Sequence, residues 1–230
     1  MFDGPEDAGI RYPPVDPSRA LRPRDRAAEA SAAAGGSVAG IVLAAGASTR
    51  FGRNKLLLRI EGESLARRAA SAALGAGLRP VVVVLGHEAD RIRSELSGLA
   101  VRDVFNPDYE LGMDTSLRAG LAALRDDVAA AVVQLADMPR VTSAMLSRLV
   151  ERFVETGAPI VASDYQGVHA PPTLYSRALF PELGGAEGDG SGRRLVRRRE
   201  SDVVRVPWPA DALADVDREE DWERMDTRTP

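Results

Sequence analysis

The sequence lacks cysteine altogether and has few aromatic residues. Without cysteine, disulfides, thiolate metal sites and cysteine nucleophiles are all excluded. Aromatic residues make up only 5% of the chain, which disfavours a stacking platform for single-stranded nucleic acid. The net charge is −4 and the pI is near 5.4, so an overall basic field for binding DNA or RNA is also absent.

Long apolar runs are missing as well. No stretch approaches the roughly 20 consecutive apolar residues of a membrane span, and the first residues show no apolar signal core. We therefore expect a cytoplasmic protein with neither a membrane nor a nucleic acid as partner. The 230 residues, 44% of them hydrophobic, are enough for one sizeable core.

Residues 1–36 differ in composition from the rest of the chain. Several prolines precede the small-residue run AAEASAAAGG, and large apolar side chains are nearly missing. Such a segment buries too little apolar surface to offset its ordering entropy. We expect a disordered or over-extended N-terminal tail, followed by one folded domain over residues 37–230.

From residue 38 onward, apolar runs alternate with segments of helical spacing. Strands are predicted at 38–45, 80–86, 101–105, 129–137 and 158–163, and helices at 63–77, 88–98, 114–124 and 142–157. This order predicts an α/β fold, with a mostly parallel central sheet and helices on both faces. The segment HAPPTLYS, 169–176, is predicted to be an edge strand or a loop, because sheets confine proline to such places.

The stretch LAAGASTRFGRNK, residues 43–55, follows the first predicted strand. Its small residues let backbone N–H groups approach an anion, and the cations Arg50 and Lys55 would neutralise it. Ligands of α/β sheets bind at the carboxyl ends of strands, so the pattern favours a triphosphate site. Five residues separate Gly46 from Gly52, so the loop fits neither a Walker A loop nor a dinucleotide fingerprint. The alternative is an ordinary strand-to-helix turn with solvated charges.

Four further motifs follow this loop in order. They are NPDYELGMDTSLRAGL (106–121), LADMP (135–139), GDGSGRRLV (188–196) and DVDREEDW (215–222). Together with LAAG-x-S-x-R-x-G-x-x-K, they resemble the MobA-like NTP transferase superfamily, and within it most closely the molybdenum cofactor cytidylyltransferases. The resemblance implies a single Rossmann-like nucleotidyltransferase domain. It also implies transfer of CMP from CTP to the terminal phosphate of molybdopterin, with release of pyrophosphate.

The resemblance assigns roles to particular residues. Arg50, Lys55 and Asp137 would be catalytic, and Asp137 would hold Mg²⁺ together with Asp217. The residues implied to contact the nucleotide are Leu43, Ala44, Ala45, Gly46, Ser48, Asn106, Gly112 and Ser116. The alternative for Asp137 is a turn cap, for Asp217 a helix cap, and for Ser116 capping and packing.

Ala45 bears on the choice of nucleotide. In the family, Leu-Ala-Ala-Gly accompanies cytosine and Leu-Ala-Gly-Gly accompanies guanine, so the resemblance favours CTP. One methyl group discriminates modestly, by about 1–3 kcal/mol.

The acceptor side of the sequence matches the family less well. The segment 165–175 reads YQGVHAPPTLY, whereas the family usually shows Gly-x-x-Gly-His-Pro, so His169 is displaced. The arginines of 193–199 would serve an anionic pterin cofactor or would form a solvated helix face. A molybdenum hydroxylase or its maturation chaperone would be the partner. The alternatives are another nucleotide or phosphorylated acceptor, or a non-catalytic chaperone for a pterin cofactor.

Overall fold

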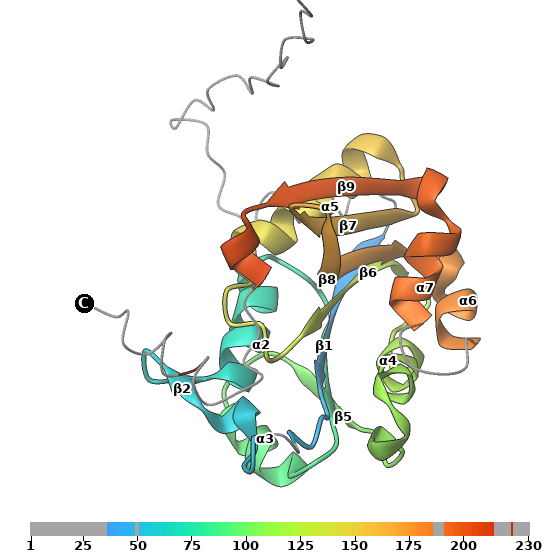
Figure 1. The fold of residues 1–230 in the computed structure, drawn as a ribbon. Helices are drawn as coiled ribbons and strands as arrows, with labels where there is room; N and C mark the ends of the chain where they lie inside the picture. The colour runs from blue at the N-terminus through green and yellow to red at the C-terminus, as the bar shows by residue number, and fades with distance from the viewer. Residues whose placement is uncertain (1–35, 49–50, 186–190, 214–221, 223–230) are drawn as a thin grey trace, which may run out of the picture.

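A seven-stranded sheet forms the centre of the fold in the computed structural model, which describes residues 36–48, 51–185, 191–213 and 222 (Figure 1). Its strands, in spatial order, are β5 (Arg102–Phe105), β4 (Val81–Leu85), β1 (Ser37–Ala44), β6 (Val128–Leu135), β8 (Val168–Ser176), β7 (Ile160–Tyr165) and β9 (Val203–Trp208). Strand β8 is antiparallel to β6 and β7, and the other neighbouring strands run parallel. The predicted α/β fold with a mostly parallel sheet is therefore confirmed.

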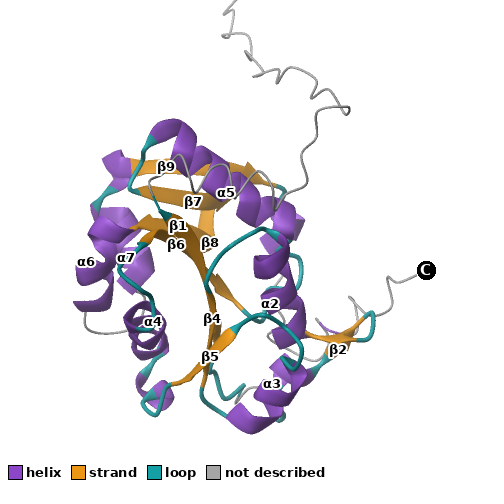
Figure 2. Cartoon of the chain, turned by 180° about the vertical axis from the view of Figure 1, so that it is seen from behind, coloured by secondary structure: helices purple, strands orange, loops and turns teal. Residues whose placement is uncertain are grey.

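Helices cover both faces of this sheet (Figure 2). On one face lie α2 (Leu65–Gly75), α3 (Ala89–Glu95) and α5 (Ser143–Thr156). On the other face lie α4 (Met113–Ala122), α6 (Phe180–Gly185) and α7 (Ser191–Arg198). Alternate side chains of β1 enter the two cores, with Val42 and Ala44 on the α2 face and Ile41 and Leu43 on the α4 face. A strand buried on both faces has to be apolar throughout, which explains the continuous apolar run of β1.

The helix starts show which capping rules hold in this chain. Thr142 caps α5, because its side-chain oxygen accepts a hydrogen bond from the backbone N–H of Met145 at 3.3 Å. The helix predicted at 114–124 begins one residue earlier, and neither Asp114 nor Thr115, the polar residues at its start, occupies the capping position. Helix α4 begins at Met113 after Gly112, whose φ of 122° is readily available only to glycine.

Strand β8 corrects the prediction of an edge strand or a loop for 169–176. It lies inside the sheet, and residues 173–176 pair with β6. Pro171 and Pro172 precede that pairing and fall in an irregularity of the register with β7. Their carbonyls accept hydrogen bonds from Tyr165 Oη (2.9 Å) and Ser163 Oγ (2.7 Å). The prolines therefore remove no N–H from the part of the strand that pairs with β6.

A short hairpin lies beside the sheet and follows the loop after β1. The 3₁₀ helix η2 (Lys55–Leu57) leads into β2 (Arg59–Ile60) and β3 (Glu63–Ser64). Trp222 packs on this hairpin, and its Nε1 donates a hydrogen bond to the carbonyl of Arg59 at 3.1 Å. The predicted tail, apart from its last residue, lies outside the described residues. Among the helices of the described ranges, none is long and apolar enough to cross a membrane.

Candidate active site

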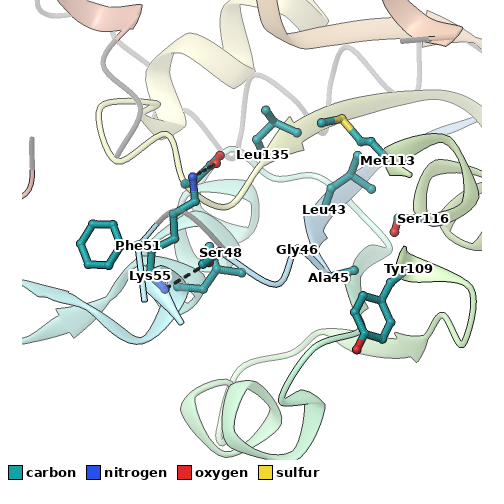
Figure 3. A pocket seen from close by; sticks show the side chains of 12 residues that line it. Leu43, Ala45, Gly46, Ser48, Phe51, Lys55, Tyr109, Met113, Ser116 and Leu135 are labelled. Atoms are coloured by element: carbon teal, nitrogen blue, oxygen red, sulfur yellow. Dashed lines mark hydrogen bonds and ion pairs between the residues drawn. The ribbon is translucent and has the colours of Figure 1, made fainter. Parts of the chain in front are cut away.

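A cleft of about 370 Å³ opens at the carboxyl ends of β1 and β6 (Figure 3). These strands are parallel neighbours, and Leu43 pairs with Leu135, so the loops that follow them meet at one sheet edge. The lining residues come from these two loops, from η2 and from the turn into α4; they are Leu43, Ala45, Gly46, Ser48, Phe51, Lys55, Leu56, Tyr109, Met113, Ser116, Leu135 and Asp137.

The loop after β1 presents its backbone to the cleft. A Cβ placed on Gly46 would meet no atom within 4 Å, so the chain is open to the cleft there. Ser48 has a positive φ of 51°, and its carbonyl accepts a hydrogen bond from the Phe51 N–H at 2.8 Å. The Ser48 Oγ accepts a second bond from the Lys55 N–H at 3.2 Å (Figure 3). This folded loop of small residues leaves room for an anion to approach the main chain.

An ion pair between Lys55 and Asp137 joins the two loops. The Lys55 Nζ lies 2.7 Å from Asp137 Oδ2, and the two side chains are only 14% and 21% exposed. Lys55 begins η2, whose start is capped by the Asn54 side chain. It is also the only lysine of the chain, in which every other cationic side chain of the Lys/Arg type is arginine. The cleft thus contains a compact ammonium group, whereas every other position of this charge type in the chain has the larger, planar guanidinium of arginine.

The second carboxylate oxygen of Asp137 fits a divalent cation. Oδ1 is buried and has no hydrogen-bond partner in the described part of the chain. Mg²⁺ is usually bound through one or two carboxylates together with phosphate oxygens and water. The described residues contain no group of three or more histidine, aspartate or glutamate side chains that could hold a metal. Asp137 could thus supply one carboxylate to such a cation, beside phosphate oxygens and water.

The turn between β5 and α4 forms the other end of the cleft. Asn106 is buried behind it, and its Nδ2 donates hydrogen bonds to Thr115 Oγ1 (2.8 Å) and Ser116 Oγ (2.9 Å). Ser116 itself lines the cleft, whereas Asn106 does not. Gly112 lines a second pocket next to the cleft.

The structure brings seven of the predicted site residues together in the cleft; they are Leu43, Ala45, Gly46, Ser48, Lys55, Ser116 and Asp137. The side chain of Ala44 lies instead in the core, where it is 1% exposed. Arg50 and Asp217 lie outside the described residues. Tyr109, Met113 and Phe51 line the cleft without having been predicted. The first two occupy the aromatic and methionine positions of the 106–121 motif, which was a usable signal, but no pattern singled out Phe51.

The second pocket has a volume of about 660 Å³ and shares Leu43, Met113 and Leu135 with the cleft. Its other walls come from α4, from β8 and from α7; residues from these elements include Asp114, Leu117, His169, Pro171, Thr173, Tyr175, Arg193, Arg194 and Arg197. The common wall means that two ligands could lie next to each other.

The arginine cluster of 193–199 is divided by the structure. Arg193, Arg194 and Arg197 line the second pocket, and Arg194 Nη2 lies 3.6 Å from Asp114 Oδ2. Arg198 and Arg199 do not line it, and instead pair with Glu182. Three members of the cluster thus line a pocket, whereas two are held by an ion pair with Glu182 of α6.

His169 lines the same pocket as a neutral side chain. Its Nδ1 lies 3.0 Å from the carbonyl oxygen of Ser163, and because a carbonyl only accepts, Nδ1 carries the proton. Burial lowers the pKa of His169, and the charges of Arg205 and Arg193 lower it further. Burial likewise raises the pKa of Tyr175 well above its usual value. This pocket therefore combines three arginines and one carboxylate, Asp114, with neutral polar groups.

A mostly parallel sheet with a cleft at the carboxyl ends of β1 and β6 is the arrangement of an α/β ligand-binding protein. The family of MobA-like NTP transferase domains matches residues 40–203, and the chain belongs to it. It is accordingly a nucleotidyltransferase of the MobA-like family.

Three similar proteins illustrate the range of this family. The chain is 30% identical over 198 residues to the nicotine blue oxidoreductase of Paenarthrobacter nicotinovorans, covering 83% of this chain and 92% of that protein. It is 32% identical over 178 residues to the "Probable molybdenum cofactor guanylyltransferase" of Opitutus terrae, covering 74% and 85%. Among solved structures, the chain is similar to Rv0371c from Mycobacterium tuberculosis in complex with manganese. The sequence identity is 28% and the TM-score is 0.68, and the match covers 84% of this chain and 100% of that one.

Proposed function

We propose that the protein transfers CMP from CTP to the terminal phosphate of a molybdopterin-type cofactor and releases pyrophosphate. The observation that carries this proposal is the Lys55–Asp137 pair in a cleft that shares a wall with an arginine-lined pocket. Such a layout suits two anionic substrates that react with each other. The similarity to a protein named as a molybdenum cofactor guanylyltransferase supports the same acceptor class.

The reaction needs positioning and charge neutralisation more than covalent help from the protein. A phosphate oxygen of the acceptor would attack the α-phosphorus of CTP, and the bond from that phosphorus to the pyrophosphate would break. Lys55 would bind the β- and γ-phosphates and neutralise the charge that develops on the departing pyrophosphate. The loop after β1, with Ser48 at its turn, would hold the triphosphate through backbone N–H groups.

Asp137 would hold a Mg²⁺ ion through the oxygen that has no protein partner in the described residues, with Asp217 proposed as a further carboxylate. Bound there, the ion supplies charge stabilisation for the phosphates. The manganese complex of a 28% identical protein supports a divalent cation in this fold. Arg50 is proposed to act with Lys55 on the triphosphate.

The choice of CTP rests on Ala45, whose side chain lines the cleft. Its methyl group takes up space that glycine would leave to a larger base, which favours a pyrimidine. GTP is the competing nucleotide, because a relative carries the guanylyltransferase name.

The acceptor would enter the second pocket, where Arg193, Arg194 and Arg197 provide charge for its phosphate. The product would then pass to a molybdenum hydroxylase or to its maturation chaperone. A relative at 30% identity carries an oxidoreductase name, so the test has to measure nucleotide transfer itself.

The decisive experiment combines the purified full chain, molybdopterin and Mg²⁺ with each of CTP, GTP, ATP and UTP. Pyrophosphate release and the nucleotide-bearing pterin product are measured together, with Lys55→Met as the inactive control. The expected result is a cytosine dinucleotide formed from CTP. A guanine product would show that the nucleotide is GTP and not CTP. Pyrophosphate release only with a different phosphorylated acceptor would show that the acceptor is not molybdopterin. No product with any nucleotide would refute the transferase and leave a binding role.

A further inference from the structure

The end of the cleft opposite Lys55 is lined mainly by apolar groups. Figure 3 shows Lys55 and Ser48 on one side of the cleft, and Tyr109, Met113 and Ser116 on the other. The Tyr109 hydroxyl donates a hydrogen bond to the carboxylate of Glu110 at 3.3 Å. With the triphosphate at the Lys55 side, the base of a nucleotide would reach Ser116. The direction of the Ser116 hydroxyl proton then decides whether the base must present a hydrogen-bond acceptor or a donor at this position.

The orientation of the Asn106 amide follows from a main-chain contact. The backbone N–H of Asp108 lies 3.1 Å from Asn106 Oδ1. A backbone N–H only donates, so this atom is the amide oxygen and the other is the NH₂ group. Both protons of that NH₂ group are then used, one for Thr115 Oγ1 and one for Ser116 Oγ, at 2.8 and 2.9 Å.

Among the residues that the structure describes, this arrangement leaves one hydroxyl proton without a partner. Thr115 donates its own proton to the carbonyls of Asp108 (2.9 Å) and Gly112 (2.8 Å). Ser116 Oγ accepts from Asn106 Nδ2, and among the described residues its hydroxyl donates to no other group. The side chain is only 4% exposed, and that opening faces the cleft. A buried donor without a partner is costly, so a ligand that accepts the proton gains affinity.

We propose that Asn106 makes Ser116 an obligate hydrogen-bond donor to the base, and that this selects a base with an acceptor at the matching position. Ser116 is the contact residue, and Asn106 is a positioning residue. Cytosine suits this donor, because its N3 and O2 are adjacent acceptors, whereas N3 of uracil carries a proton. The proposal rests on the proposed function only in taking the ligand to be a nucleoside triphosphate.

The test uses substitutions that change the hydrogen-bond polarity with little change of shape. In Asn106→Asp the carboxylate has no proton to donate, so Ser116 has to donate to it and turns a lone pair towards the base. In Ser116→Ala the donor is removed. Thr115→Ala is the matched control, since Thr115 shares the same amide but does not line the cleft.

Binding of CTP and of UTP to the full chain with Mg²⁺ is measured by titration calorimetry, without an acceptor. We expect Ser116→Ala to weaken CTP binding about 3- to 10-fold, and Asn106→Asp to weaken it about 10-fold or more. Both should reduce the preference for CTP over UTP, whereas Thr115→Ala should leave that preference unchanged. In the Ser116→Ala background, Asn106→Asp should have no further effect on the preference, because the hydroxyl it acts through is gone.

A preference for CTP over UTP that Ser116→Ala leaves unchanged overturns the proposal, even if Asn106→Asp proves too unstable to purify. So does an absence of binding by both nucleotides. Because these measurements need no acceptor, they separate this proposal from the proposed function. Normal base selection without any transfer to molybdopterin would refute only the acceptor.

Discussion

The cleft and the pocket beside it are built in different ways. The cleft takes its ion pair from the segments that follow two parallel neighbours, β1 and β6, and the turn into α4 forms its other end. The second pocket takes its groups from the antiparallel strand β8 and from helices α4 and α7, which are far apart in the sequence. The difference teaches that the cleft, the proposed reactive centre, depends mainly on main chain and one charge pair, whereas the neighbouring pocket depends on individual side chains.

The largest expected effect comes from removing the charge that defines the cleft. Lys55→Met should lower kcat for CMP transfer about 10²- to 10³-fold, because a preorganised cation next to the developing charge is lost. The matched control is Arg59→Met, which removes an exposed cation paired with Glu95 outside the cleft. Steady-state kinetics with CTP checks this, and a kcat within threefold of the parent would refute the role of Lys55.

A smaller and more selective effect is expected in the second pocket. Arg193→Gln should raise the KM for the pterin acceptor roughly 10-fold or more, since a charge-assisted hydrogen bond is lost. The calorimetric Kd for CTP should not change. Arg198→Gln is the control, because Arg198 pairs with Glu182 and does not line the pocket. If Arg193→Gln weakened CTP binding as much as acceptor binding, the two regions would not be separate sites.

The single lysine offers a direct probe of the cleft. An amine-reactive acetylating reagent can modify only Lys55 and the chain's α-amine. CTP with Mg²⁺ should slow acetylation of Lys55 in proportion to occupancy, about 10-fold when roughly nine-tenths of the protein is bound. Peptide mass spectrometry separates the two amines, and the α-amine serves as internal control. Equal rates with and without CTP, at a concentration shown to bind, would place the nucleotide elsewhere.

The smallest effect concerns stability and belongs to the second pocket. Burial lowers the pKa of His169 in the folded chain, so the unfolded chain binds more protons once the pH falls below about 6.5. Stability should therefore decline on acidification from pH 7 to 5.5. His169→Asn keeps a donor for the Ser163 carbonyl but cannot titrate, so it should lose less stability over this range. Urea unfolding at both pH values decides, and equal losses would contradict a buried neutral histidine.

The cleft could be predicted from the sequence to the extent that its parts are local. Residues 43–55 contain the loop and its lysine within one turn, and LADMP places Asp137 just past the end of a strand. Successive side chains of β1 point to opposite faces of the sheet, however, so the side chain of Ala44 lies in the core although its neighbours Leu43 and Ala45 line the cleft. Such facing depends on the twist and pairing of the strand, which a motif does not describe.

The second pocket was predictable only in part, because its groups meet through tertiary structure. The arginine run of 193–199 was recognised, but only contact with Glu182 shows which members point away from the pocket. The prolines in 169–176 argued against a strand inside the sheet. The hydrogen bonds that hold this proline segment come from the side chains of Ser163 and Tyr165 on the neighbouring strand β7, which the segment itself does not show. Likewise, Asn106 donates a hydrogen bond to Ser116 from behind the cleft wall. Both residues belong to the 106–121 motif, but their spacing in the sequence does not show this bond.

The antiparallel course of β8 has a consequence for how such proteins diversify. Strands β7 and β8 form a hairpin whose turn lies around Gln166 and Gly167, and that turn leads directly into His169 and Pro171 on the wall of the second pocket. Insertions or substitutions in this hairpin would reshape that wall and leave the β1 and β6 loops untouched. A lineage can thus acquire a new acceptor by drift around one hairpin turn while inheriting its nucleotide chemistry intact.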